Sequence, residues 1–201
     1  MRVSPTVRVA LCGALGGGTN AWLCFARVPV PVKENPDFGW HLIPAGAIHG
    51  AVLAGVAFGL GVILSRRPLR ARLAAALPVA WLAGFASWIP LNRSAFDEPW
   101  SKSFLWALDQ GWDAALLRPL QCFGFVALLY YAAVAFWLTR ESRITPHVAS
   151  ASVAGVLGSL YWWSEMEPWY LSILHGAIWG ACVGVGAWAS HRASGGEGEM
   201  R

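Results

Sequence analysis

Charged side chains are scarce in this sequence. Only 13% of the 201 residues are Asp, Glu, Lys or Arg, whereas about 25% is usual in a soluble domain. The charges are also clustered, which leaves long stretches of the chain without any. A soluble domain of this length covers its core with charged side chains, and this chain has too few of them to do so. The composition therefore argues against an ordinary soluble globular protein.

Motifs of known catalytic and metal sites are missing as well. The sequence has neither H-E-x-x-H nor G-x-S-x-G, and the glycines at 16–18 lack the lysine that completes a phosphate-binding loop. No C-x-x-C pair occurs, and no histidine stands at metal-site spacing from a cysteine. We interpret the cysteines as small buried apolar side chains; they are Cys12, Cys24, Cys122 and Cys182. These absences favour a protein that is not an enzyme.

Long apolar stretches are what the sequence does have. Hydrophobic residues make up 56% of the chain, and 13 residues are Trp, a side chain enriched at membrane–water interfaces. A helix of about 20 apolar residues crosses the hydrocarbon core of a bilayer, which is about 30 Å thick. Six stretches approach this requirement: residues 7–25, 43–64, 73–91, 120–138, 148–163 and 171–189. The predicted fold is therefore all-α, a polytopic bundle of about six transmembrane helices.

We expect one domain, residues 1–192, followed by a disordered cytoplasmic tail, residues 193–201, that is rich in Gly and Glu. The first apolar stretch follows Arg2 and Arg8, as the core of a secretory signal would. It is longer than a typical signal and no A-x-A cleavage site follows it, so we predict a retained helix. Cleavage would leave five spans, with the new N-terminus outside.

The distribution of arginine and lysine predicts the orientation of the bundle. With the N-terminus inside, the short inner loop at residues 65–72 contains four arginines. The inner segments then hold Arg2, Arg8, Arg66, Arg67, Arg70, Arg72, Arg140, Arg143, Arg192 and Arg201, and the outer segments hold Arg27, Lys33, Arg93, Lys102 and Arg118. We predict a multi-pass protein of a bacterial-type inner cell membrane with both termini cytoplasmic. The basic pI of about 9.1 then reflects topology and not nucleic-acid binding.

The second and sixth spans share a short signature. His49-Gly50-Ala51 matches His175-Gly176-Ala177, and further glycines follow at Gly55, Gly59 and Gly61 in one span and at Gly180, Gly184 and Gly186 in the other. We hypothesise that spans 1–2 and 5–6 are duplicated helical hairpins; a chance match between low-complexity segments is the alternative. Glycines at this spacing usually let helices pack closely in a membrane, and we expect that role here.

Two histidines carry the main functional hypothesis. His49 and His175 are the ionisable residues that lie well inside the predicted spans, and such residues usually face the interior of a bundle. In the simplest interpretation each ring is structural and bonds a backbone carbonyl or a serine. In the functional interpretation the pair faces the interior and binds or transports a small solute or ion. Other polar side chains in or near the spans would assist: Asn20, Tyr130, Tyr161 and Ser164.

Other functions compete with this one. The two histidines would ligate a b-type haem in a membrane electron-transfer protein, with Gly50 and Gly176 leaving room for the porphyrin. Alternatively, the chain is a non-transporting auxiliary protein that forms a homo-oligomer or joins a membrane partner subunit. An acid–base or metal site of His175 with Glu165 and Glu167 is disfavoured, because Pro168 interrupts the helix between them. The lipid bilayer is the partner that all of these share.

Overall fold

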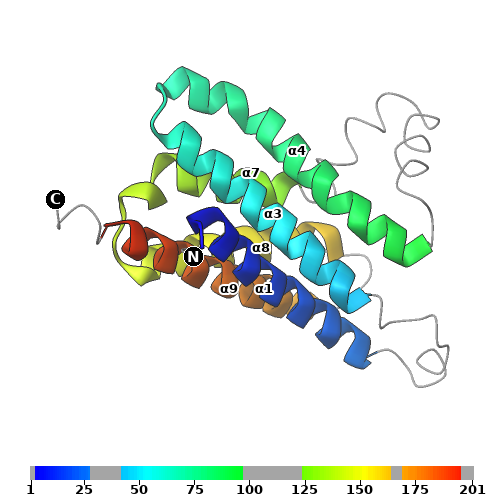
Figure 1. Cartoon of the computed structure of the whole chain (residues 1–201). Helices are drawn as coiled ribbons and strands as arrows, with labels where there is room; N and C mark the ends of the chain where they lie inside the picture. The colour runs from blue at the N-terminus through cyan, green and yellow to red at the C-terminus, as the bar shows by residue number, and fades with distance from the viewer. Residues whose placement is uncertain (1–2, 28–41, 97–123, 164–168, 196–201) are drawn as a thin grey trace, which may run out of the picture.

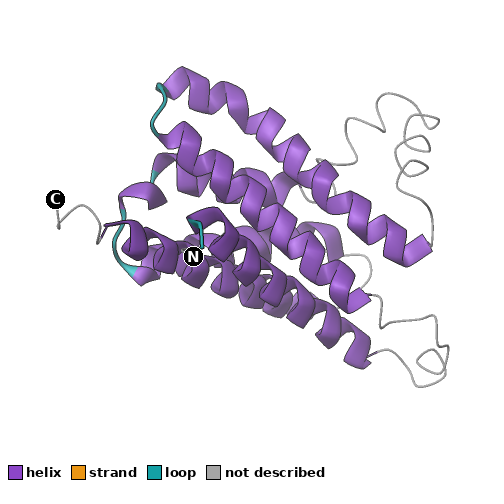
Figure 2. Ribbon diagram, viewed as in Figure 1, coloured by secondary structure: helices purple, strands orange, loops and turns teal. Residues whose placement is uncertain are grey.

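The structure is a computed structural model that describes residues 3–27, 42–96, 124–163 and 169–195. Its regular secondary structure is entirely helical within these ranges (Figures 1 and 2). The elements are α1 (Pro5–Arg27), α3 (Leu42–Ser65), α4 (Leu69–Phe96), α7 (Phe125–Phe136), a short 3-10 helix η2 (Leu138–Arg140), α8 (Ile144–Trp163) and α9 (Trp169–Gly195). Each α-helix covers most of one predicted apolar stretch, so the all-α prediction is confirmed.

The six α-helices pack side by side in a bundle. Helices α1 and α3 form one close pair and α8 and α9 another, while α1 also packs along α9. Helices α4 and α7 pack against α3, and α7 contacts α8. The start of α1, the α3–α4 turn, the α7–α8 connection and the end of α9 all lie at one end of the bundle (Figure 1).

We call this the arginine-rich end. The described arginines there are Arg8, Arg66, Arg67, Arg70, Arg72, Arg140, Arg143 and Arg192. Glu141 is the acidic residue of the described part of this end. Residues brought together from both halves of the sequence therefore give one end of the bundle a strong positive charge.

The surface of the bundle is unusually apolar. Large aliphatic side chains point outward on α1, α3 and α4; Leu15 is 66% exposed, Leu77 63% and Ile63 62%. The buried core consists largely of Ala and Val with a few larger side chains. In water, so much exposed apolar surface would mark an interaction site or an aggregation hazard, whereas in lipid it is the expected exterior.

Three helical segments are long and apolar enough to cross a membrane, as judged over the described residues. They are Gly46–Ser65, Leu69–Ala86 and Ile173–Ala193. Two further apolar helices, Phe125–Arg140 and Ile144–Leu160, are shorter. Helix α9 also runs to Gly195, three residues into the predicted tail; the rest of the tail lies outside the described ranges.

Glycines bring the paired helices into backbone contact. In the α1–α3 pair, a methyl group on Gly13 would overlap the carbonyl oxygen of Gly50, and one on Gly50 would overlap the carbonyl oxygen of Gly13. Gly155 and Gly176 make the same reciprocal contact between α8 and α9. A side chain at any of these four positions would push the helices apart. The prediction that the glycines form packing faces is confirmed.

Helix α1 and helix α9 meet along an antiparallel seam. At the arginine-rich end, the Ser190 hydroxyl donates a hydrogen bond of 3.1 Å to the Pro5 carbonyl. Farther along, Cys12 lies opposite Gly186, and Gly16 lies opposite Cys182. At the far end, the Asn20 amide donates to the carbonyl of His175. This seam joins the first and last helices and places α1 between α3 and α9.

Candidate functional site

Few polar side chains lie in the interior of the bundle. Among the described residues the buried polar ones are His147, His175 and Ser190. Five buried side-chain atoms lack a hydrogen-bond partner within the described part: the Asn20 Oδ1, the Arg72 Nε, the Trp81 Nε1, the Tyr130 hydroxyl oxygen and the His147 Nδ1. Buried polar groups are normally bonded, so these atoms are candidates for contact with a ligand or water.

The best-defined polar contact is between Asn20 on α1 and His175 on α9. The Asn20 Nδ2 donates to the His175 carbonyl oxygen at 2.9 Å, and the His175 residue is only 2% exposed. The Asn20 Oδ1 is fully buried and receives no donor from the described residues. An unsatisfied buried acceptor of this kind costs about 1–3 kcal/mol. A bound N–H or O–H group, or a small cation, would remove that cost.

The position of this contact matters for its role. Asn20 lies about 22 Å along α1 from Pro5, at a rise of about 1.5 Å per residue. The contact therefore lies in the half of α1 that is far from the arginine-rich end.

Tyr130 extends the polar region towards α7. Its side chain is completely buried, and its ring meets that of Trp179 edge-on, with centroids 6.4 Å apart and planes at 79°. Trp179 lies one helical turn after His175 on α9, and its Cα lies against Gly16. Asn20 thus bonds the backbone of His175, and one turn farther along α9 Trp179 contacts Tyr130; we call these four residues the interior polar cluster.

The other predicted site residues are placed differently. His49 is partly buried on α3, directly before the Gly50 that contacts α1. Helix α3 packs chiefly on α1 and only marginally on α9, so α1 lies between the two helices that carry His49 and His175. Tyr161 belongs to α8 but its side chain is outside what the structure describes, as is Ser164. The role of these three residues stays a prediction.

The two glycines next to the histidines do not provide space for a porphyrin. The backbone of Gly13 fills the space beside Gly50, and the backbone of Gly155 fills the space beside Gly176. Within the described residues, no group of three or more His, Cys, Asp or Glu side chains is placed to hold a metal ion. The argument for haem that rested on these glycines is therefore lost.

Sequence reasoning missed a second histidine site, at the arginine-rich end. His147 is only 2% exposed. Its Nε2 lies 2.8 Å from the Glu141 carbonyl oxygen, and the His191 ring centroid lies 6.0 Å from its own. A carbonyl oxygen can only accept, so Nε2 carries the hydrogen.

The environment of His147 favours the neutral ring. Burial is the main cause that lowers its pKa below the usual value, and the His191 ring adds to the effect, while Glu141 opposes it. In the neutral ring Nδ1 is an acceptor, and it is buried without a donor among the described residues. The sequence did hold a signal that these two histidines lie close together. In the predicted hairpin of spans 5–6, His147 stands near the start of the first helix and His191 near the end of the second.

Comparisons with protein-family models, with curated proteins and with solved structures found no match to this chain. The functional conclusion therefore depends on the geometry of the bundle alone.

Proposed function

We propose that the chain is a six-span integral membrane protein with both termini in the cytoplasm. The charge of the arginine-rich end supports this, because arginines concentrate on the cytoplasmic side of membrane proteins. All four inner segments that the sequence predicts meet at that end (Figure 1). The exposed leucines of α1 and α4 would face lipid. The shorter helices would be supported by the long ones against which they pack.

We further propose that the interior polar cluster binds, or lets pass, a small polar solute or a small cation. The observation that carries this is the Asn20 Oδ1, which is buried and lacks a donor among the described residues. The Asn20 amide bonds the backbone of the buried His175, and neither side chain bears a fixed charge. Such a site favours neutral hydrogen-bond donors, protons or weakly hydrated cations over anions.

The duplication of the two hairpins is part of the same proposal. Two observations support it. In both hairpins the glycine that follows the histidine makes a reciprocal backbone contact with a glycine of the preceding helix. The His-Gly-Ala signature stands at the same place relative to that contact. If the hairpins are related, His49 occupies in the first hairpin the position that His175 occupies in the second.

A liposome assay tests the solute site. We would reconstitute the full chain and measure three permeabilities: to protons, driven by a potassium diffusion potential, and to urea and glycerol, by light scattering. We expect at least one to exceed that of empty liposomes. Asn20→Leu should then lower this permeability about tenfold, the factor that corresponds to about 1.4 kcal/mol. The substitution removes both the acceptor oxygen and the amide group that positions that oxygen.

Thr19→Val is the matched control for Asn20→Leu. Thr19 is the adjacent residue, and its hydroxyl bonds the carbonyl of Leu15 in its own helix at 2.7 Å, so its loss should leave permeability unchanged. Permeabilities equal to those of empty liposomes for all three probes would contradict passage of a solute through the cluster. Equal permeabilities of the Asn20→Leu and Thr19→Val variants would show that Asn20 is not part of the site.

A further inference from the structure

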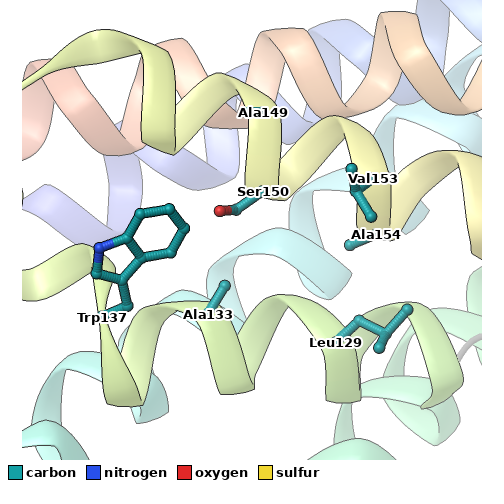
Figure 3. A pocket seen from close by; sticks show the side chains of 7 residues that line it. All are labelled: Leu129, Ala133, Trp137, Ala149, Ser150, Val153 and Ala154. Atoms are coloured by element: carbon teal, nitrogen blue, oxygen red, sulfur yellow. The ribbon is translucent and has the colours of Figure 1, made fainter.

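An apolar groove lies between α7 and α8 on the outside of the bundle (Figure 3). Its volume is about 350 Å³. One wall is a single face of α7, formed by Leu129, Ala133 and Trp137, and the other wall comes from α8 with Ala149, Ser150 and Val153. The small side chains of Ala133 and Ala149 make room between the helices, while Trp137 lies at the end nearest the α7–α8 connection.

The dimensions of the groove limit what can occupy it. From Leu129 to Trp137 the groove follows about 12 Å of helix, at a rise of about 1.5 Å per residue. Beyond it, the side chain of Val126 fills the space over Gly158 and closes the gap between α7 and α8. A transmembrane helix of a partner would need a face about 30 Å long. An acyl chain needs only the depth of one leaflet, about half of that.

Charge complementarity identifies the kind of lipid. Arg140 ends η2, three residues after Trp137, and Arg143 directly precedes α8. Both residues are exposed and stand in the connection between the two helices that form the groove, with Glu141 between them in the sequence. Trp137 is 50% exposed and lies between this charged connection and the apolar walls, as Trp does at headgroup depth. Basic groups above an apolar interhelical groove on the cytoplasmic side favour anionic headgroups.

We propose that the α7–α8 groove binds one anionic phospholipid of the inner leaflet. One acyl chain lies between Leu129 and Val153, and the phosphate lies over Arg140 and Arg143. The inference rests on the membrane placement in the proposed function, but not on the solute site. It gives the bundle a specific lipid partner at its arginine-rich end.

Native mass spectrometry of the delipidated full-length protein in detergent tests this. Phosphatidylglycerol and phosphatidylcholine would be added in turn as probes. We expect one phosphatidylglycerol to bind about tenfold more tightly than phosphatidylcholine. The double variant Arg140→Gln, Arg143→Gln should lose this preference. Ala149→Phe should fill the groove and weaken binding of both lipids.

The matched controls make the same types of substitution at positions away from the groove. Arg66→Gln with Arg67→Gln removes two exposed arginines from the α3–α4 turn, and Ala74→Phe adds a ring to an exposed alanine of α4; both should bind lipid like the wild type. Equal affinity for the two lipids, or equal loss in the test and control variants, would overturn the proposal. A dimer, or a bound polypeptide, that dissociates in the Ala149→Phe variant would also overturn the proposal, because the groove would then be a helix-binding site.

Failure of the lipid site and failure of the membrane placement are distinguishable. Alkaline carbonate extraction of cell membranes reports integration of the chain independently of lipid selectivity. A chain that stays in the carbonate pellet but shows no phosphatidylglycerol preference contradicts the lipid proposal alone. A chain released by carbonate contradicts both proposals.

Discussion

Gly17→Ala should lower the melting temperature markedly, whereas Gly18→Ala, which adds the same methyl group one residue later, should not. A Cβ on Gly17 would overlap the carbonyl oxygen of Gly46 and lie 3.2 Å from the Cα of Gly50. These are backbone atoms of α3, so the two helices themselves must separate. A Cβ on Gly18 meets its nearest neighbour, the Ala47 Cβ, at 3.5 Å, which is an ordinary contact.

The effects of the two substitutions on the free energy of unfolding therefore differ in sign as well as in size. Overpacking in a close interface typically costs about 1–3 kcal/mol. Replacing glycine by alanine within a helix gains up to about 1 kcal/mol where the space allows it. At about 2–4 °C per kcal/mol for a chain of this length, Gly17→Ala should melt several degrees below the wild type and Gly18→Ala at or slightly above it.

Thermal unfolding in detergent, followed by circular dichroism at the helix bands, measures this difference. Both variants should keep the helical signal of the wild type at low temperature. Equal melting shifts for the two variants would show that α1 and α3 do not cross at Gly17.

Arg72→Met should also destabilise the bundle, while Arg70→Met should have little effect. The Arg72 guanidinium donates to the Ala135 carbonyl at 3.1 Å and lies over the Phe136 ring, 4.9 Å from its centroid. The backbone carbonyl of Arg72 in turn accepts from the Tyr131 hydroxyl at 2.9 Å. These three contacts join the start of α4 to the end of α7.

The expected loss follows from those contacts. A hydrogen bond from a charged donor contributes about 1.5–3 kcal/mol, and an exposed cation–π contact about 0.5–1 kcal/mol. The buried Nε of Arg72, which has no partner among the described residues, offsets part of this gain. We therefore expect Arg72→Met to cost about 2 kcal/mol.

The same melting experiment compares Arg72→Met with Arg70→Met. Both variants remove one positive charge from the arginine-rich end, and both keep an apolar stem. Arg70 is exposed, so the difference between the two reports the contacts of Arg72 rather than its charge. A melting temperature for Arg72→Met that equals that of Arg70→Met would mean that α4 and α7 are not joined in this way.

The helices were predictable because apolar length alone specifies them. The predicted stretch at residues 43–64 corresponds to Leu42–Ser65, and 171–189 lies within Trp169–Gly195. Helix α4 starts earlier than predicted, at Leu69 and not at residue 73. Arginine has good helix propensity, so Arg70 and Arg72 extend the helix although they cannot lie in a hydrocarbon core.

The interior polar cluster was only partly predictable. Asn20, His175 and Tyr130 were chosen for their depth in apolar stretches, and the structure places Asn20 against the His175 backbone and Tyr130 against Trp179; their role as a site stays a prediction. The face on which a residue lies was harder to predict, because helices that are apolar on all sides have little amphipathic pattern. His147 is the clearest example: it stands next to the edge of a predicted span, and no local pattern indicates that α8 buries it.

The central claim is a six-span chain with both termini in the cytoplasm, and a reporter fused after Arg201 tests it most directly. One fusion would carry green fluorescent protein, which becomes fluorescent in the cytoplasm but not when it is exported unfolded. The other would carry alkaline phosphatase, which is active only outside the cytoplasm. We predict a fluorescent first fusion and an inactive phosphatase. A dark first fusion with an active phosphatase would place the C-terminus outside and contradict the account.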